Sequence, residues 1–276
     1  QNGPVGHLDI SAVSFFLPDG RPLLDEVDLR VADGAKVALV GPNGAGKTTL
    51  LNTVAGLLRP AAGSVELDGH NVTGRDPAAL VNAGLALVPE RRRIFRDLTV
   101  EENLRLAGIT ATKSERRQRL AEMRDLFAVL ARKWHTSAGY LSGGEAQQLA
   151  VARALMSDPR MLLMDEPTLG LAPALIDVIF DLLVDLRDQG RTVLVVEQNA
   201  RRVLELADRG YVLRTGQIVS QGNGQIFRPG WTFAKTDIQD GFEDVPIEWF
   251  GGRSSVADRP DSSAAFRYAL RFCAAM

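Results

Sequence analysis

The nine residues Gly41–Thr49, with the sequence GPNGAGKTT, constrain what this chain can fold into more than any other stretch. They satisfy the pattern G-x-x-x-x-G-K-[ST] of the P-loop, a glycine-rich loop that cradles phosphate groups. The apolar run 36–40 before the loop predicts a buried strand, and residues 49–55 after it predict the first turns of a helix. The motif works in this strand–loop–helix order, so we expect a nucleotide-binding α/β domain.

The chemistry expected of the loop comes from its glycines, its lysine and its first threonine. Glycines allow successive backbone N–H groups to converge on an oxyanion, and the helix N-terminus adds its partial positive charge. We expect Lys47 to reach the β- and γ-phosphates and the Thr48 hydroxyl to ligate Mg²⁺. The predicted nucleotide-binding residues are Gly41, Pro42, Asn43, Gly44, Ala45, Gly46, Lys47, Thr48 and Thr49. A glycine-rich turn that fits the pattern by chance is the alternative, and the motifs described below make it the weaker one.

Composition excludes several classes of protein. The 276 residues leave room for one large domain or two small ones, and a formal net charge of −2 gives no overall attraction to nucleic acid or anionic lipid. The single cysteine, Cys273, excludes an internal disulfide and a cluster of thiolate ligands. Since there is no apolar run of about 18 residues and no signal peptide, we expect a soluble chain of the cytoplasmic type. The first residue is Gln1, which leaves the native start open.

Hydrophobic periodicity predicts an order of strands and helices around the loop. Two strands, 8–15 and 24–31, are expected to form an antiparallel flap ahead of the P-loop strand. Further strands are predicted at 63–67, 85–88, 161–165, 192–196, 211–214 and 217–220, and helices at 100–107, 114–130, 142–156, 173–187 and 200–207. The alternation of strands and helices implies a doubly wound α/β core with a mixed or parallel sheet. The run of helices between two strand-rich parts implies an inserted helical subdomain at about 97–157.

The sequence changes character near residue 227. We expect residues 1–227 to form the nucleotide-binding domain and residues 228–276 to form a C-terminal tail of unknown order, since the aromatic residues of the tail follow no sustained period. Within the tail, residues 262–276 show helical spacing. Two interpretations of the tail remain, an interaction element and a weakly ordered appendage, and the second is favoured.

Two neighbouring acids, Asp165 and Glu166, end the apolar strand 161–165. The carboxyl ends of strands are where ligands lie in open α/β sheets. Asp165 suits a ligand of the Mg²⁺ that Thr48 would also hold, and Glu166 suits a base or an orienting group for the attacking water. The alternative is a capped strand end with two solvated acids, and the presence of the P-loop favours the functional interpretation.

The pentapeptide 141–145, LSGGE, combines a serine and two glycines at a predicted helix N-terminus. Such a group of free N–H donors forms an anion site, and we expect it to have nothing to contact inside its own subunit. An ordinary capped helix, which the pattern S-x-x-E alone would satisfy, is the alternative. The pentapeptide lies between the P-loop and the Asp-Glu strand, and in this order the motifs resemble those of the ATP-binding cassette (ABC) ATPases, whose signature is LSGGQ. The resemblance covers about residues 8–225.

This resemblance implies an ABC cassette that binds ATP with Mg²⁺ and hydrolyses it. It also implies that two cassettes enclose two ATP molecules head to tail, so that the signature of one cassette contacts the γ-phosphate held by Lys47 of the other. The residues expected to act in trans are Ser142, Gly143, Gly144 and Glu145. The expected catalytic residues are Glu166, Gln198 and Lys47, and the expected metal ligands are Thr48, Asp165 and Glu90.

Longer segments narrow the resemblance to the ATPases of branched-chain amino-acid importers. Residues 88–95, VPERRRIF, are similar to the VPEGRRVF segment of that group, and agreement continues at 99–104, 169–173, 196–200 and 207–213. In that family two different cassettes pair, and this chain resembles the second of them. The implied partners are a second ABC ATPase subunit or a second copy of this chain, two transmembrane permease subunits and, indirectly, a solute-binding protein. The implied location is the cytoplasmic face of the plasma membrane, and the acidic balance argues against a nucleic-acid partner.

Some positions depart from the general ABC pattern. Glu90 occupies the Q-loop position and Gln198 the position of the switch histidine. Glu90 keeps an oxygen that Mg²⁺ accepts, whereas Gln198 can hydrogen-bond a γ-phosphate but cannot become cationic. We therefore expect the two ATP sites of the heterodimer to be unequal. The aromatic residue that stacks on adenine is replaced by Leu17, with Phe16 or Phe15 as substitutes if the register shifts, so a modest nucleotide affinity is expected.

The basic run Arg91–Arg93 lies in a loop that faces the membrane subunit in ABC importers. Arg91 takes the place of the glycine typical of the subfamily. The run is interpreted either as a grip on the permease or as a solvated stretch of charge, and the sequence favours neither.

The combined prediction is an ATP-hydrolysing subunit of an importer for branched-chain amino acids. Importers of urea and short amides are the nearest alternative, because their cassettes share much of this sequence. A soluble ABC ATPase acting on nucleic acid or ribosomes is a second alternative, disfavoured by the lack of a second cassette and of a coiled-coil insertion. A regulatory module with little turnover is the third. The solute itself cannot be derived, because an ATPase subunit does not touch it.

Overall fold

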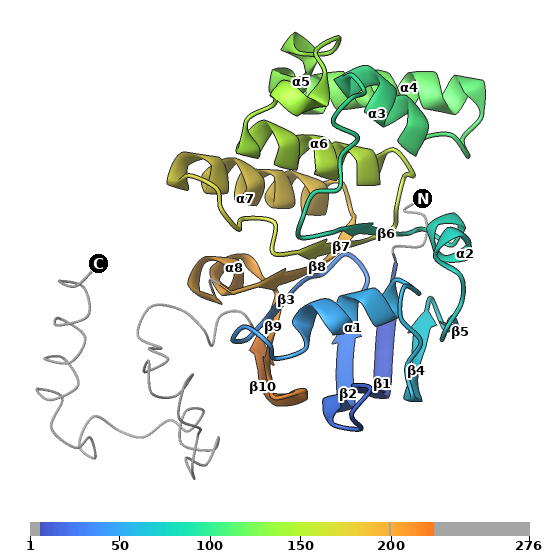
Figure 1. The fold of residues 1–276 in the computed structure, drawn as a ribbon, viewed down its shortest axis with the longest axis vertical. Coiled ribbons are helices and arrows are strands. Elements are labelled where there is room, and N and C mark those ends of the chain that lie inside the picture. Colours follow the sequence, from blue (N-terminus) through green and yellow to red (C-terminus); the bar gives the residue numbers. More distant parts are fainter. Residues whose placement is uncertain (1–5, 199, 224–276) are drawn as a thin grey trace, which may run out of the picture. The chain divides into compact units, whose positions relative to one another are not determined.

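The computed structural model describes residues 6–198 and 200–223. The predictions made for the tail 228–276, including the helical spacing at 262–276, lie outside the described residues. Within the described part, strands form two sheets and several of the helices gather in a separate layer (Figure 1). No helix among these residues is long and apolar enough to cross a membrane.

The first sheet is antiparallel and has four strands in the order β2-β1-β4-β5. Its strands are β1 (Leu8–Phe16), β2 (Pro22–Val31), β4 (Ala62–Leu67) and β5 (His70–Asn71). The predicted flap is therefore present, and it is larger than the two strands predicted ahead of the P-loop. The short strand β5 was not predicted.

The second sheet has six strands in the order β10-β9-β3-β8-β7-β6. Its strands are β3 (Lys36–Val40), β6 (Leu85–Val88), β7 (Met161–Asp165), β8 (Thr192–Glu197), β9 (Arg209–Arg214) and β10 (Gln217–Asn223). Its neighbours pair in parallel except β9 with β10, which confirms the predicted mixed sheet. Every residue of β3, β7 and β8 is buried, because a central parallel strand is covered on both faces.

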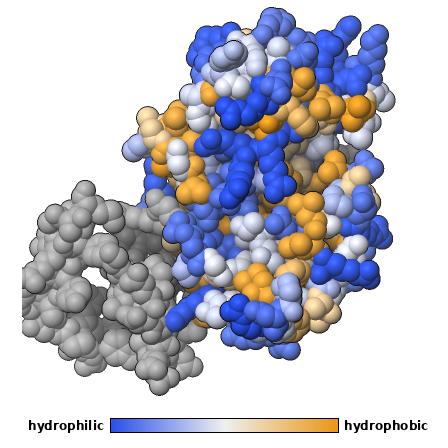
Figure 2. All heavy atoms as spheres, viewed as in Figure 1, coloured by the Kyte–Doolittle hydropathy of each residue, from blue (hydrophilic) through white to orange (hydrophobic). Residues whose placement is uncertain are grey.

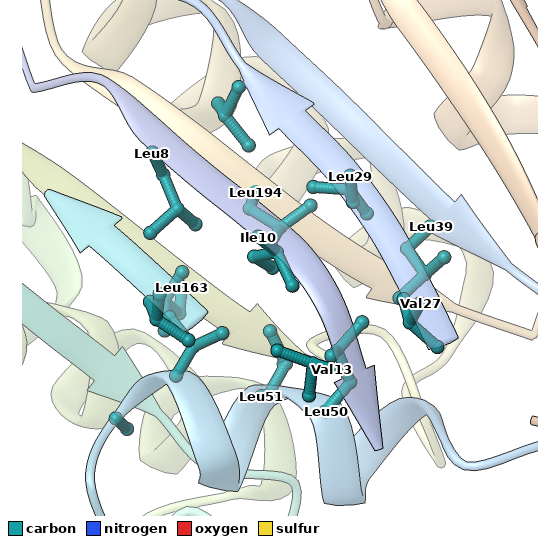
Figure 3. Close-up of a cluster of buried hydrophobic side chains, with 14 of the residues drawn as sticks. Leu8, Ile10, Val13, Val27, Leu29, Leu39, Leu50, Leu51, Leu163 and Leu194 are labelled. Atoms are coloured by element: carbon teal, nitrogen blue, oxygen red, sulfur yellow. The ribbon is translucent and has the colours of Figure 1, made fainter. Parts of the chain in front are cut away.

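A single hydrophobic cluster joins the two sheets to helix α1 (Lys47–Val54). Figure 3 shows leucine, isoleucine and valine side chains of β1 and β2 meeting Leu50 and Leu51 of α1, with Leu163 and Leu194 of the parallel sheet behind them. The first turn of α1 is thus packed against side chains of both sheets. This packing holds the loop that precedes α1 in one place relative to the ends of β7 and β8.

The helical layer consists of α3 (Val100–Ala107), α4 (Lys113–Leu126), α5 (Ala128–Arg132) and α6 (Gly143–Leu155), seen at the top of Figure 1. Capping boxes at Thr99, Thr112 and Ser142 begin α3, α4 and α6. The remaining helices are α2 (Pro77–Asn82), α7 (Pro173–Asp188), α8 (Ala200–Leu206) and a 3₁₀ turn at Ala138–Tyr140. Helix α2, which Asp76 caps, was not predicted.

The prediction of one helix over 114–130 is wrong. The chain leaves helical geometry at Phe127, whose backbone angles are φ −117° and ψ 75°, and a second helix begins at Ala128. The side chain of Phe127 is buried, as is that of Leu130. Burial of this ring among the helices competes with the local preference for a continuous helix, and the tertiary term prevails.

Candidate functional site

The P-loop links the end of β3 to the start of α1, as the sequence predicts. Gly44 and Gly46 have left-handed backbone angles, with φ of 80° and 103°. A Cβ atom on Gly46 would lie 2.7 Å from the carbonyl oxygen of Leu23, and one on Gly41 would collide with the carbonyl of Leu213. Glycine is therefore required at these positions both for conformation and for space. Around Gly44 the space is open, as a loop that receives a ligand requires.

Lys47 holds its ammonium group over the loop. Its side chain is buried, and Nζ donates hydrogen bonds to the carbonyl oxygens of Gly41 at 2.7 Å and Pro42 at 3.0 Å. Nζ also lies 3.5 Å from a carboxylate oxygen of Glu166. The lysine of α1 and the acid that follows β7 are thus adjacent, although 119 positions separate them in the sequence.

Asp165 and Thr48 meet at the carboxyl end of β7. The Thr48 hydroxyl donates to Oδ1 of Asp165 at 3.2 Å. The pKa of Asp165 is raised to about 6, mainly by burial; the charges of Glu166 and Glu90 add to the rise, and the Thr48 hydrogen bond and the charge of Lys47 oppose it. A buried carboxylate beside other acids is stabilised by a cation, so this environment suits metal binding.

The donors present fit Mg²⁺ held jointly with a nucleotide. Among the described residues no group of three or more His, Cys, Asp or Glu side chains is arranged to hold a metal alone. Magnesium commonly takes one or two carboxylates from the protein and the rest of its ligands from phosphates and water. Thr48 and Asp165 are such a partial set, and Glu90 lies near enough for its charge to act on Asp165.

A cleft of about 380 Å³ opens over these residues. From the P-loop it is lined by Asn43, Gly44, Gly46, Lys47, Thr48 and Thr49. Three polar residues predicted from other segments, Glu90, Glu166 and Gln198, line it as well. The fold therefore gathers in one cleft Glu166, expected from its place at a strand end, and Glu90 and Gln198, which the sequence linked to the P-loop only through resemblance.

Two leucines of the cleft, Leu23 and Leu169, were not predicted. Leu23 lies on β2, and Leu169 lies in the loop after Glu166. Nothing in the local pattern marks either residue, because an apolar side chain beside a phosphate loop resembles any other core leucine. Leu23 belongs to the antiparallel sheet and Leu169 to a loop of the other sheet, so their positions depend on how the two sheets pack together.

The predicted adenine contacts lie outside this cleft. Phe16, at the end of β1, is 47% exposed, whereas Phe15 packs against the core. Leu17 is half-buried in the turn after β1, where its N–H donates to the carbonyl of Arg21 at 2.8 Å. Of the three, Phe16 offers the exposed aromatic surface.

A buried carboxylate, Glu197, ties two loops of the site together and was not predicted. It accepts hydrogen bonds from the Thr168 hydroxyl at 2.7 Å and the Thr168 backbone N–H at 3.0 Å. Burial is the main cause that raises the pKa of Glu197, with Glu166 adding to it, and the backbone of Gln198 bonds the same carboxylate and lowers the pKa. The loop after Glu166 and the loop of Gln198 are therefore joined through one group. An acid at the end of the apolar run VLVVE was the available signal.

The signature residues lie at the start of α6 and do not line the cleft. The expectation that they contact nothing inside their own subunit is wrong for Ser142 and Glu145. The Ser142 side chain caps the Glu145 N–H, the Glu145 carboxylate accepts from the Ser142 N–H at 2.8 Å, and Lys133 pairs with Glu145 at 2.7 Å. A sequence with S-x-x-E closes its own capping box, since both partners are local.

The two signature glycines differ in their surroundings. Gly143 is exposed, and a Cβ atom there would lie 3.6 Å from the guanidinium of Arg92. Gly144 is buried, and a Cβ atom there would collide with the side chain of Leu175 at the start of α7. The exposed surface of the signature is thus formed by Ser142 and Gly143.

The arginines of the run 91–93 have different partners. Arg91 is exposed, whereas Arg92 donates from Nε to Oε1 of Gln147 on α6 at 3.1 Å. Arg93 is exposed and lines an apolar groove of about 230 Å³. The other residues of this groove are Ala55, Leu57, Pro77, Val81, Leu85, Leu87 and Pro89. Arg92 is therefore not part of a simple solvated run, Arg93 borders a groove, and Arg91 is exposed outside the residues that line it.

Comparison with known proteins gives consistent matches. A family model described as ABC transporter matches residues 24–169. The chain is 45% identical over 201 residues to the high-affinity branched-chain amino acid transport ATP-binding protein BraG of Pseudomonas aeruginosa, covering 73% of this chain and 86% of that protein. It is 40% identical over 201 residues to the probable branched-chain amino acid transport ATP-binding protein LivF of Archaeoglobus fulgidus, covering 72% and 85%.

A solved structure extends the comparison to the fold. The dimeric post-hydrolysis state of an ATP-binding cassette, bound to ADP and phosphate, matches with a TM-score of 0.69 and 27% identity. The match covers 78% of this chain and 98% of that chain.

Proposed function

The chain belongs to the ABC transporter family and is an ATPase of that type, and from this premise we propose that it energises an importer of branched-chain amino acids. The observation that carries the proposal is the cleft in which Lys47, Glu166 and Gln198 meet above the P-loop. The solute class comes from the names of BraG and LivF, which are similar to this chain over most of its described part. An importer of urea or short amides is the alternative within the same class.

In the proposed reaction the P-loop N–H groups and Lys47 bind the β- and γ-phosphates of ATP. Lys47 exchanges its two carbonyl partners, Gly41 and Pro42, for phosphate oxygens. Bound Mg²⁺ supplies positive charge to the same oxygens. Thr48 and Asp165 are proposed to hold it, with Glu90 as a further oxygen ligand.

Glu166 is proposed to orient the attacking water and to accept its proton. Water then bonds to the γ-phosphorus while the bond to the oxygen of ADP breaks, which releases ADP and phosphate. Gln198 donates a hydrogen bond to the γ-phosphate through its amide. Because an amide does not become cationic, Gln198 adds less charge stabilisation than a histidinium would. If the heterodimer has unequal sites for this reason, Gln198→His in the assembled transporter changes turnover, and an unchanged rate contradicts the hypothesis.

The proposed catalytic unit contains two cassettes. The matched ADP-bound cassette is dimeric, and in this chain Ser142 and Gly143 are exposed at the N-terminus of α6. We propose that these residues contact the γ-phosphate bound by a second cassette, which is either a different subunit or another copy. Gly144 packs against Leu175 and Glu145 pairs with Lys133, and we propose that these contacts hold the exposed residues in position.

The proposed contact with the permease is the apolar groove bordered by Arg93. Its residues come from the segment after α1, from α2, from β6 and from the loop after β6, which also contains Glu90. Movement at Glu90 on hydrolysis would therefore pass to the groove through one short connection. With two permease subunits bound in this way, the cassettes would lie at the cytoplasmic face of the plasma membrane, and a solute-binding protein would deliver the solute.

The decisive experiment is purification of the tagged full chain from native membranes, with identification of the co-purifying subunits. We expect two multi-spanning permeases and a second cassette, and the associated solute-binding protein is then titrated with leucine and with urea. The variant Glu166→Gln is the matched control, because it should retain the same partners and lose hydrolysis. Recovery of ribosomes, or of no membrane protein, would contradict the transport proposal, and equal hydrolysis in both proteins would favour a regulatory module.

A further inference from the structure

A second hollow lies in the helical layer, away from the P-loop cleft. It has a volume of about 370 Å³ and is lined by residues of α3, α4 and the segment that follows α5. Five of its lining residues are cationic, namely Arg105, Lys113, Arg116, Arg117 and Arg124. One lining residue, Glu101, is acidic. We refer to these six residues together with Leu120, Ala121 and Trp134 as the basic groove.

Four of the five cations of the basic groove lie on α4, and the fifth, Arg105, lies on α3. Lys113, Arg117 and Arg124 are spaced by four and seven residues, which places them on one side of an α-helix. None of the three acids of the same helix, Glu115, Glu122 and Asp125, lines the groove: Glu115 accepts from the Thr112 N–H in the capping box, and Glu122 accepts from Gln118. Positive and negative charges of α4 are thus segregated, whereas a merely solvated helix surface commonly mixes them.

The single acid of the basic groove is already paired. Glu101 accepts from Arg105 at 2.7 Å and lies 3.3 Å from His135. Lys113, Arg116 and Arg117 have no carboxylate partner within residues 6–198 and 200–223. Three cations therefore face the same hollow with their charge uncompensated, which favours the entry of an anion.

The floor of the basic groove is rigid and apolar. Trp134 is buried, its carbonyl accepts from the Glu101 N–H at 3.0 Å, and the guanidinium carbon of Arg124 lies 5.1 Å from the centre of its ring. Figure 2 shows largely hydrophilic residues over the α4 and α5 end of the molecule. A low-dielectric floor strengthens the attraction between the cations above it and a bound anion.

From these observations we infer that the basic groove binds the phosphate groups of a compact anion. Three arginines offer planar donor forks that suit phosphate oxygens, and Lys113 adds a point charge. A carboxylate ligand would leave most of these donors unused. The phosphates can come from a soluble polyphosphate or from the headgroup of an anionic lipid, and both have the chemistry that the groove matches.

The test uses the full chain with its P-loop saturated by ADP, so that added phosphate does not enter the first cleft. Inorganic tripolyphosphate is titrated calorimetrically, and in parallel the protein is sedimented with vesicles of phosphatidylglycerol or of phosphatidylcholine. The test variant is Lys113→Gln/Arg117→Gln, whose side chains are exposed. The matched control is Arg75→Gln/Arg132→Gln, which removes the same charge from exposed positions outside the groove.

We expect one site for tripolyphosphate, weakened about tenfold or more in the test variant and unchanged in the control. Binding limited to phosphatidylglycerol vesicles, and lost in the same variant, assigns the phosphates to a lipid headgroup. No binding of either probe overturns the inference, and so does binding that both double variants weaken equally. Far-ultraviolet circular dichroism of both variants verifies that α4 remains folded. The inference does not depend on the transported solute.

Discussion

Both α1 and α6 have glycines at their N-termini, yet the free backbone N–H groups of the two helices are capped differently. At α1 the N-cap is Gly46 in the left-handed region, with no side-chain cap and no acid in the first turn. At α6 the N-cap is Ser142, with a complete capping box and Glu145 in the first turn. Free N–H groups and the helix dipole attract an anion only where no side chain already satisfies them.

This difference indicates two ways of handling phosphate. The N-terminus of α1 has no side-chain cap, and without ligand Lys47 donates hydrogen bonds to the carbonyl oxygens of Gly41 and Pro42. The α6 terminus is stable by itself, and its Ser142 and Gly143 remain exposed toward a partner. The first site should therefore bind nucleotide in a single subunit, whereas the second should matter only when two cassettes meet.

Removing the charge at the open terminus should have the largest effect. We expect Lys47→Ala to lower ATP hydrolysis by about 100-fold or more, because a preorganised charge at the phosphates is lost. The control is Lys133→Ala at the closed terminus, where the lysine pairs with Glu145, and single-subunit ATP binding should then be retained. Equal loss of nucleotide binding in the two variants would contradict the distinction between the termini.

The next largest effect should come from a change in packing at the capped N-terminus of α6. Gly144→Ala places a methyl group against Leu175, and we expect it to lower the free energy of unfolding by about 1–3 kcal/mol. Gly143→Ala meets no atom closer than 3.6 Å and should leave the stability of the isolated subunit nearly unchanged. Urea unfolding gives the free energy of unfolding of each variant, and the two values are compared with that of the unchanged protein. A larger loss for Gly143→Ala would show that the exposed and buried roles are reversed.

The proposed metal ligand at the open site should make Mg²⁺ binding depend on pH. The pKa of Asp165 is raised to about 6 by burial, so the group binds a proton below that pH and Mg²⁺ must displace it. Between pH 7 and pH 5 we expect the apparent Mg²⁺ affinity of the ADP-bound protein to fall about tenfold, by simple proton competition. Isothermal titration at the two pH values measures this. Asp165→Asn is the control and should bind Mg²⁺ weakly at both; a wild-type affinity that rises on acidification would refute the assignment.

The smallest effect should follow from loss of the Ser142 cap. Ser142→Ala removes the acceptor for the Glu145 N–H, and we expect a cost of about 1 kcal/mol in the stability of the isolated subunit. Ser142→Thr keeps the hydroxyl and should restore most of the loss. Thermal unfolding compares the three proteins, and no difference between serine and alanine would mean that the capping box does not stabilise α6.

Local sequence patterns were sufficient for the features that depend on neighbouring residues. The P-loop conformation follows from glycines at 44 and 46, the capping boxes follow from S/T-x-x-E, and β3, β7 and β8 follow from unbroken apolar runs. The end of α4 at Phe127 could not be predicted from local patterns, because it depends on which helices the Phe127 ring packs against. The same holds for Leu23 and Leu169, which reach the cleft through the packing of the two sheets and the loop after β7.

The sequence by itself thus determined the phosphate loop, the class of fold and the identity of the two acids at the end of β7. The tertiary structure decided which distant residues meet them: Glu90 and Gln198 at the P-loop, Glu197 on Thr168, and the cations of α3 and α4 around Trp134. The physical reason is range. A turn, a cap or a buried strand is specified by residues within a few positions of one another, whereas a cleft depends on the packing of whole elements, which local patterns do not encode.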